Sequence, residues 1–175
     1  MKKNALFLDR DGIINIDKKY VHKIKDFEFC DGIFELCNFF IQKDFLIFVI
    51  TNQSGIARGY YTENDFQILS SFMKDEFYKK NIKIEKIYHC PHLQGCECRK
   101  PKPAMLLKAQ KEFDIDMEKS FFIGDNITDM QAGINANVKN LFLINENYKD
   151  DENYKDDENY KVFKNLKELL KYLKD

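Results

Sequence analysis

The sequence predicts an α/β fold of three layers, in which an open, Rossmann-like parallel sheet lies between helices on both faces. Three features lead to this prediction: short apolar runs recur along the chain, amphipathic patterns with helical spacing separate them, and polar residues close several of the runs. Folds of this kind bind ligands at the carboxyl ends of their strands. The functional site is therefore expected at that edge of the sheet.

Five runs rich in Phe, Ile, Leu and Val are the predicted strands. They are apolar on consecutive residues, as expected of strands that are buried on both faces. They span residues 5–9, 45–51, 86–90, 121–125 and 141–144. Asp9, Thr51, Cys90 and Asp125 end four of these runs, so their side chains should meet at the ligand-binding edge.

Patterns of helical spacing fill the intervals between the strands. The first helix has an apolar stripe at Ile33, Leu36, Cys37, Phe40 and Ile41. A second helix begins after Thr62, which can form a capping box with Asp65. A third begins near Pro103, and a fourth covers about residues 127–136. A fifth helix, at the C-terminus, carries leucines between residues 166 and 173 and should dock on the sheet.

Length and charge favour one soluble enzyme-sized domain, residues 1–175. The 28 Lys and Arg residues nearly balance 29 Asp and Glu residues, so the net charge of −1 provides no general attraction for nucleic acid or for an anionic membrane. No apolar stretch approaches the roughly 20 residues of a membrane span, and the first apolar run is too short for a signal peptide. We therefore expect a cytoplasmic monomer with no nucleic-acid or membrane partner.

A tandem repeat interrupts the pattern near the C-terminus. The motif NYKDDE occurs at residues 147–152 and again at 153–158. Its period of six residues matches neither a helix nor a usual solenoid repeat. We interpret residues 146–161 as a low-complexity surface insertion without an assigned function.

Carboxylates at the strand ends predict phosphoryl transfer with magnesium. Asp9 could attack phosphorus as a nucleophile, and Asp11 could act as the acid and base that serves the leaving group and the water. Each could instead cap a turn, and Asp125 could cap a helix. Three carboxylates in one place would repel one another without a cation, which favours Mg²⁺ held by Asp9, Asp125 and a backbone carbonyl in the first turn.

Two other segments could bind the phosphate. Thr51, in TNQSG, offers a hydroxyl group beside amides and a glycine that can donate hydrogen bonds. Arg99 and Lys100 stand in RKPKP, directly before a predicted helix, where a helix N-terminus also favours anions. Lys100 could hold the transferring phosphoryl group, while Arg99 could grip another part of the substrate. As isolated residues these cations could equally be solvated surface charges.

A cluster of sulfur and nitrogen ligands lies in CPHLQGCEC. Cys90, His92, Cys96 and Cys98 supply the four ligands that a structural zinc ion requires. An alternative is a reactive or disulfide-forming set of thiols, which a reducing compartment disfavours. The zinc would stabilise the loop that ends in Arg99 and Lys100.

The four sets of residues resemble the motifs of the haloacid dehalogenase (HAD) superfamily of phosphotransferases. DRDG resembles its first motif, Thr51 its second, Lys100 its third, and Gly124-Asp125 with Asp129 its fourth. The resemblance implies a HAD-type fold, an aspartyl-phosphate intermediate on Asp9 and catalytic roles for Asp11, Thr51 and Lys100. It further implies that Asp9, Asp11 and Asp125 are associated with Mg²⁺. It also implies that no large cap domain covers the site.

Within this superfamily, residues 6–138 are most similar to the D-glycero-D-manno-heptose 1,7-bisphosphate phosphatases. Similar segments include NIDKKYVHKIKDFEF, TNQSGIARG, C-x-CRKPKP and GDNITDMQAG. This resemblance implies hydrolysis of the C7 phosphate of a small phosphorylated sugar, in the synthesis of nucleotide-activated heptose for lipopolysaccharide or another surface polysaccharide. Asn126 stands where those enzymes are expected to have lysine. The substrate-binding residues that we predict are Asp9, Arg10, Asp11, Asp17, Tyr20, Thr51, Asn52, Gln53, Ser54, Arg99, Lys100 and Asn126.

Three other functions compete with this interpretation. Histidinol-phosphate phosphatases share the DRDG, CPH and CRKPK features, although TNQSGIARG favours the heptose enzymes. A catalytically silent zinc-binding interaction module would not need Asp9, Asp11, Lys100 and Asp125 together. A nucleic-acid 3′ phosphatase is disfavoured because the chain has no basic stripe.

Overall fold

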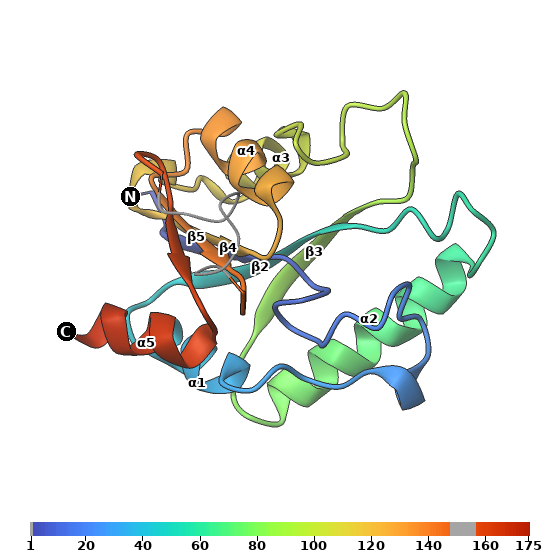
Figure 1. The fold of residues 1–175 in the computed structure, drawn as a ribbon, viewed down its shortest axis with the longest axis horizontal. Helices are drawn as coiled ribbons and strands as arrows, with labels where there is room; N and C mark the ends of the chain where they lie inside the picture. The colour runs from blue at the N-terminus through green and yellow to red at the C-terminus, as the bar shows by residue number, and fades with distance from the viewer. Residues whose placement is uncertain (1, 148–156) are drawn as a thin grey trace.

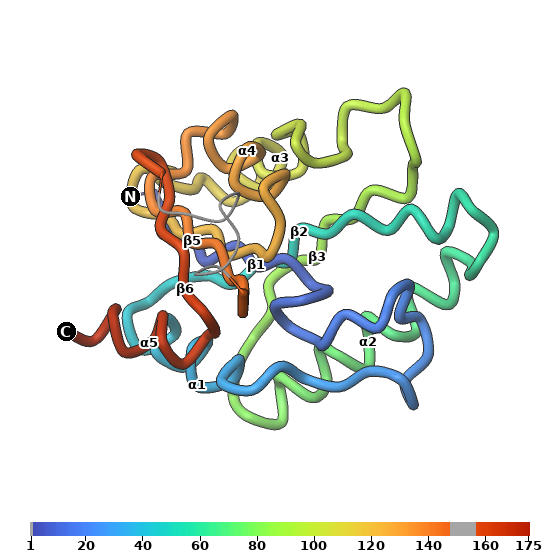
Figure 2. Tube along the Cα trace, in the orientation of Figure 1, coloured from blue at the N-terminus to red at the C-terminus, as the bar shows by residue number. Residues whose placement is uncertain are grey.

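The computed structural model describes residues 2–147 and 157–175 and contains one six-stranded parallel sheet (Figures 1 and 2). The strand order is β3-β2-β1-β4-β5-β6, and every neighbouring pair is parallel. The strands are β1 (Ala5–Leu8), β2 (Leu46–Asn52), β3 (Ile84–Cys90), β4 (Phe121–Gly124), β5 (Asn140–Ile144) and β6 (Lys161–Phe163). The predicted open parallel sheet and its five strands are confirmed.

Five α-helices connect or follow the strands, as the apolar patterns predict. They are α1 (Ile33–Ile41), α2 (Glu63–Tyr78), α3 (Ala104–Phe113), α4 (Ile127–Asn135) and α5 (Leu166–Lys174). The predicted capping box of α2 is present, because Thr62 and Asp65 each accept a hydrogen bond from the other's backbone N–H. Two 3₁₀ turns, Ile24–Asp26 and Met117–Lys119, complete the regular structure of the described residues.

The helices form two layers with separate apolar cores. Helices α1, α2 and α5 cover one face of the sheet, and α3 and α4 cover the other (Figure 1). Strand β1 contributes to both cores: Leu6 and Leu8 pack on the first side, while Ala5 and Phe7 pack on the second. This burial on both faces explains why its sequence is a continuous apolar run.

The strand order places the carboxyl end of β1 at a topological switch point. From β1 the chain proceeds through β2 to β3 on one side, and then through β4, β5 and β6 on the other. Crossovers leave the sheet in opposite directions at this point, which opens a crevice beyond the strand ends. Asp9 follows β1 directly, and Asp125 follows β4 directly.

Strand β6 is the one strand of the described residues that the sequence patterns do not predict. It begins at Lys161, the last residue of the predicted surface insertion, and pairs with β5. Most of the NYKDDE repeat lies outside the described residues. Within residues 2–147 and 157–175, no segment forms a separate cap domain, and no helix is long and apolar enough to cross a membrane.

Candidate active site

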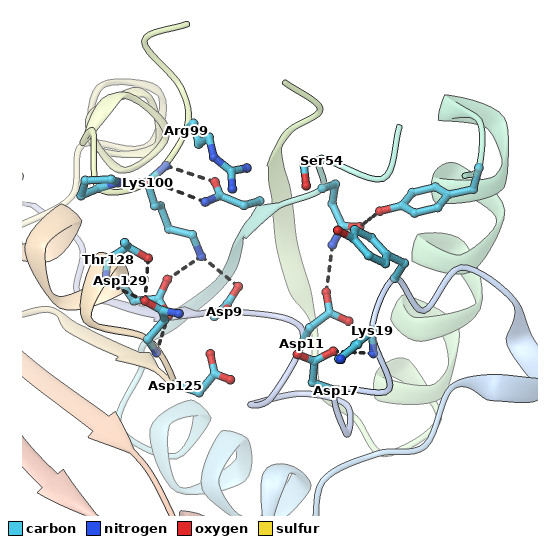
Figure 3. A pocket seen from close by; sticks show the side chains of 16 residues that line it. Asp9, Asp11, Asp17, Lys19, Ser54, Arg99, Lys100, Asp125, Thr128 and Asp129 are labelled. Carbon is cyan, nitrogen blue, oxygen red and sulfur yellow. Dashed lines mark hydrogen bonds and ion pairs between the residues drawn. The ribbon is translucent and has the colours of Figure 1, made fainter. Parts of the chain in front are cut away.

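A pocket of about 880 Å³ lies at the carboxyl edge of the sheet (Figure 3). This volume is within the usual range for a small-molecule site. Eleven predicted site residues line the pocket: Asp9, Asp11, Asp17, Tyr20, Asn52, Gln53, Ser54, Arg99, Lys100, Asp125 and Asn126. The structure also places Lys19, Tyr61, Pro101, Thr128 and Asp129 in its wall.

Thr51 and Arg10 are predicted site residues that do not line the pocket. Both are buried. The Thr51 hydroxyl accepts a hydrogen bond from Gln53 Nε2 at 2.8 Å, and the Arg10 guanidinium donates to the Val21 carbonyl and to Asp11. In this structure they support residues of the wall.

Three carboxylates converge on one side of the pocket. Oxygens of Asp9, Asp125 and Asp129 lie within 4.8 Å of one another. Two glycines permit this approach, because a Cβ added to Gly12 would lie 2.0 Å from Asp125 Oδ2, and one added to Gly124 would lie 2.4 Å from Asp129 Oδ2. Gly12 also has a φ of +89°, which a side chain would disfavour.

Lys100 is the cation that contacts this cluster. Its buried Nζ lies 2.9 Å from Asp9 Oδ1 and 2.7 Å from Asp129 Oδ1, and it donates to the Ile50 carbonyl at 2.7 Å. Burial alone would lower the pKa of Lys100, but Asp129 and Asp9 outweigh it and raise that pKa. Lys100 is therefore held as a charged ammonium group.

The loop that carries Lys100 is fixed by Asn52 at the end of β2. The Asn52 side chain accepts a hydrogen bond from the backbone N–H of Lys100 at 3.1 Å and donates to its carbonyl at 3.3 Å. This pair of hydrogen bonds connects segments that are 48 residues apart in the sequence. Asn52 thus positions the lysine in addition to lining the pocket.

One ammonium group does not balance three carboxylates. Burial, with the charge of Asp129 added, raises the pKa of Asp9 to about 7. Burial and the charges of Asp9 and Asp129 raise the pKa of Asp125 to about 9. Burial and mutual repulsion thus disfavour three ionised carboxylates beside a single ammonium group. A cluster of carboxylate oxygens fits Mg²⁺, which prefers oxygen ligands.

Asp129 belongs to this cluster, although the predicted magnesium ligands are Asp9, Asp11 and Asp125. It occupies the third position of α4, where its Oδ2 accepts a hydrogen bond from the Asn126 backbone at 3.1 Å. Asn126 in turn caps the helix through Thr128 N. The spacing of GDNITD is the sequence signal for Asp129, because a capping box fixes its third residue beside the helix start.

Asp11 stands apart from the three clustered carboxylates, on the other side of Asp9 (Figure 3). Its carboxylate accepts hydrogen bonds from Arg10 Nη2 at 2.9 Å, Asn15 Nδ2 at 3.0 Å and Gln53 Nε2 at 3.0 Å. Because all three are donors, they hold Asp11 in one orientation at the pocket wall. The Asp11 side chain, predicted as a magnesium ligand, is not among the grouped carboxylates that could hold a metal.

The four predicted zinc ligands meet in the loop after β3. One ligand atom from each of Cys90, His92, Cys96 and Cys98 lies within 4.8 Å of the other three. Desolvation acts to raise the pKa of Cys96, but hydrogen bonds led by the Arg99 backbone N–H lower it to about 6. All five cysteines are free thiols, so the disulfide alternative is not present in the structure.

The zinc ligand cluster is joined to the pocket through Arg99. The Arg99 guanidinium donates a hydrogen bond to the His92 carbonyl at 3.3 Å, and Arg99 also lines the pocket. The loop therefore connects a metal-binding motif to a cation that faces the substrate space.

A buried aspartate paired with a lysine, beside further carboxylates at the switch point of a doubly wound sheet, defines a HAD-like hydrolase. A family model described as HAD-hydrolase-like matches residues 97–169. The chain is 62% identical, over all of its 175 residues and 98% of the relative, to D-glycero-alpha-D-manno-heptose-1,7-bisphosphate 7-phosphatase of Campylobacter jejuni. It belongs to the family of heptose-1,7-bisphosphate 7-phosphatases.

Two further comparisons agree with this assignment. The chain is 46% identical to D-glycero-beta-D-manno-heptose-1,7-bisphosphate 7-phosphatase of Helicobacter pylori strain J99, with 97% of each chain covered. It also superposes on the crystal structure of D,D-heptose 1,7-bisphosphate phosphatase from B. bronchiseptica, with a TM-score of 0.86, 26% identity and 97% of each chain covered. That crystal structure is a complex with magnesium and phosphate.

Proposed function

We propose that the chain hydrolyses the C7 phosphate of D-glycero-D-manno-heptose 1,7-bisphosphate and releases heptose 1-phosphate. The observation that carries this proposal is the 62% identity over the full chain to the Campylobacter jejuni phosphatase. The arrangement of Asp9, Lys100 and the clustered carboxylates supports it, because this chemistry needs a carboxylate nucleophile beside cations.

In the first half of the reaction, Asp9 attacks phosphorus. A bond forms between a carboxylate oxygen of Asp9 and phosphorus while the bond from phosphorus to the C7 oxygen breaks. Asp11 gives its proton to that departing oxygen, which leaves as the sugar hydroxyl. Lys100 holds the transferring oxygens near Asp9, since its Nζ is already 2.9 Å from the nucleophile.

In the second half, water hydrolyses the aspartyl phosphate. Asp11, now ionised, takes a proton from the water as its oxygen bonds to phosphorus, and Asp9 is released as a carboxylate. Asp9, Asp125 and Asp129, with a backbone carbonyl in the turn after β1, would hold Mg²⁺ here. When bound, the ion neutralises charge on the phosphoryl oxygens and lowers the raised pKa values of the carboxylates.

Loops alone would select the sugar, because no cap domain is present in the described residues. Asp17 and Tyr20 come from the segment between β1 and α1, and Ser54 from the segment after β2. Arg99 lines the pocket from the loop after β3, which carries the candidate zinc ligands. It is suited to bind the second phosphate of a bisphosphate. A zinc ion bound by Cys90 and its three neighbours would be structural, since the four ligands leave no open position.

The proposal also includes the anomer of the substrate and the place of the enzyme in the cell. The relative that is 62% identical is named for the alpha anomer, whereas the relative at 46% is named for the beta anomer. We therefore propose the alpha bisphosphate as the preferred substrate. We further propose that the enzyme works as a monomer in the cytoplasm, where it prepares heptose for nucleotide activation and surface-polysaccharide synthesis.

The test is a comparison of kcat/KM for three substrates with Mg²⁺: the alpha bisphosphate, the beta bisphosphate and histidinol phosphate. We expect the order alpha, then beta, then histidinol phosphate. A higher kcat/KM on the beta anomer would reverse the anomer assignment. A higher value on histidinol phosphate would reverse the substrate class.

A further inference from the structure

Tyr61 lies in the wall of the pocket, but the mechanism above gives it no role. It belongs to the segment between β2 and α2, and only 5% of its surface is exposed. Its phenol oxygen lies 2.5 Å from Gln53 Oε1. Gln53, which is 2% exposed, also donates from Nε2 to Asp11 Oδ2 at 3.0 Å. A continuous chain of hydrogen bonds therefore joins Tyr61 to the acid and base of the reaction.

The direction of this chain follows from what each group can do. In its ionised form the Asp11 carboxylate can only accept, so the amide nitrogen of Gln53 must face it. The amide oxygen must then face Tyr61, and the phenol must donate. Burial raises the pKa of Tyr61 to about 12, so the phenol keeps its proton at neutral pH. Without this donor, the buried Gln53 amide oxygen would lose its hydrogen-bond partner, and the amide would be held less firmly with its nitrogen against Asp11.

Packing fixes the ring that carries the phenol. A Cβ added to Gly55 would lie 2.1 Å from Tyr61 Cε1, so the glycine leaves the space that the ring occupies. On another side the His22 imidazole stacks on the ring, with the ring centroids 5.0 Å apart and the planes 10° from parallel. His22 is itself held by a hydrogen bond between Nδ1 and the Tyr20 carbonyl at 2.8 Å. Segments on both sides of the pocket thus orient one hydroxyl group.

We propose that Tyr61 is a positioning residue for Asp11, acting through Gln53. It locks the Gln53 amide with its nitrogen toward Asp11, which keeps the Asp11 carboxyl aimed at the leaving oxygen. The inference rests on the proposed phosphatase function and on the assignment of Asp11 as the acid. It predicts that loss of the Tyr61 hydroxyl lowers kcat/KM most for substrates whose leaving group needs a proton.

The test is Tyr61→Phe, which keeps the ring and removes only the hydroxyl. Phenyl phosphate and p-nitrophenyl phosphate differ little in shape, but p-nitrophenolate leaves readily without protonation. We expect kcat/KM for phenyl phosphate to fall about five- to tenfold, the effect of one lost buried hydrogen bond, and kcat/KM for p-nitrophenyl phosphate to change less than about twofold. With heptose bisphosphate, kcat should fall by a similar factor while KM stays within about twofold.

Tyr78→Phe is the matched control, because Tyr78 is exposed on α2 and does not line the pocket. It should behave as the wild type on all substrates, and thermal unfolding should show both variants folded. An equal loss on both aryl phosphates, or a change in KM alone, would overturn the positioning role. The proposed function fails separately, if the wild-type enzyme turns over the aryl phosphates but not heptose bisphosphate.

Discussion

At the scale of single residues, the site depends on placing carboxylates together at the expense of stability. Asp9 and Asp129 are buried and paired with Lys100, and the half-buried Asp125 lies beside them. The pKa values of Asp9 and Asp125 rise to about 7 and about 9. Such groups are retained because the bound cation and the phosphoryl group need them.

The first prediction concerns the nucleophile. Asp9→Asn removes the charge and the nucleophilic oxygen while keeping the shape of the side chain. We expect kcat to fall at least about 1,000-fold, as for other residues that form the covalent intermediate. The rate of phosphate release at saturating substrate measures kcat. A melting temperature equal to or above that of the wild type shows that the fold is intact. Activity within about tenfold of the wild type would remove Asp9 from this role.

The second prediction concerns pH and the metal-free protein. Because the folded pKa of Asp125, about 9, lies above its ordinary value of 3.8, the native state binds more protons than the unfolded state between these values. The contribution of Asp125 to the free energy of unfolding therefore falls as the pH rises from 3.8 toward about 9. In EDTA, the melting temperature of Asp125→Asn should be about 2–4 °C above that of the wild type at pH 9. This difference between the two melting temperatures should shrink toward pH 5.

Magnesium provides the control for this prediction. Mg²⁺ should raise the melting temperature of the wild type at pH 8, because it binds the native state alone, and should leave that of Asp125→Asn unchanged. Thermal unfolding at a series of pH values measures both effects. If Asp125→Asn melts below the wild type at pH 9 in EDTA, the account of carboxylate repulsion is wrong.

Single residues differ in how far their roles can be predicted from the sequence. Asp9 and Asp125 could be placed in one site because each ends an apolar run, and parallel strands end at one edge. The sequence does not distinguish the role of Arg10 from the roles of Asp9 and Asp11. In the structure its guanidinium donates hydrogen bonds to Asp11 and to the Val21 carbonyl behind the pocket wall. The role of Tyr61 depends on the orientation of an amide, which no pattern of residue types encodes.

At the scale of elements, helix and loop starts position the charged groups. The capping box of α4 holds Asp129 beside Asn126, and Asn52 at the end of β2 holds the backbone of Lys100. Asn126, predicted as a substrate contact, thus has a structural task at the start of α4 while lining the pocket. Regular elements therefore place functional side chains with little freedom to move.

The third prediction tests the loop after β3. Cys96→Ser removes one of four ligand atoms, so we expect the purified protein to hold well below one zinc ion per chain, with a raised KM because the Arg99 loop loses its support. Elemental analysis by mass spectrometry measures the zinc. Cys30→Ser is the control, since burial raises the pKa of that thiol to about 12 and it lies outside the cluster. Equal zinc contents in the two variants would contradict the zinc site.

Long elements were predictable and one short element was not. Helix α2 is signalled by its capping box and by apolar residues at helical spacing. Strand β6 has three residues, of which only Val162 and Phe163 are buried, and it follows a polar repeat. Its pairing with β5 arises from the tertiary fold, because so short a run carries no periodicity of its own.

At the scale of the whole molecule, six parallel strands place one open pocket at the switch point. Figure 1 shows helices on both faces and no additional domain above the described strand ends. Segments that follow β1, β2 and β3 line the pocket, and we propose that they determine selectivity. These segments are far apart in the sequence, so their convergence follows from strand order alone.

The fourth prediction concerns oligomeric state. Edge strand β3 carries charged residues, with Glu85 in an ion pair with Lys83 and Lys86 in one with Glu112, and edge strand β6 is short. Charged and short edges oppose pairing between sheets. We expect light scattering after size exclusion to give the mass of one chain, 20.9 kDa. A stable mass twice that value would contradict the prediction.

The central claim is that Asp9 becomes phosphorylated between Lys100 and a magnesium ion held by the clustered carboxylates. A crystal structure of the protein with Mg²⁺ and beryllium fluoride, which mimics an acyl phosphate, tests it most directly. We expect beryllium bonded to an Asp9 oxygen, a fluorine atom beside Lys100 Nζ, and Mg²⁺ bound by Asp9 and Asp125. Beryllium fluoride bound away from Asp9, with no metal ion among the three carboxylates, would contradict it.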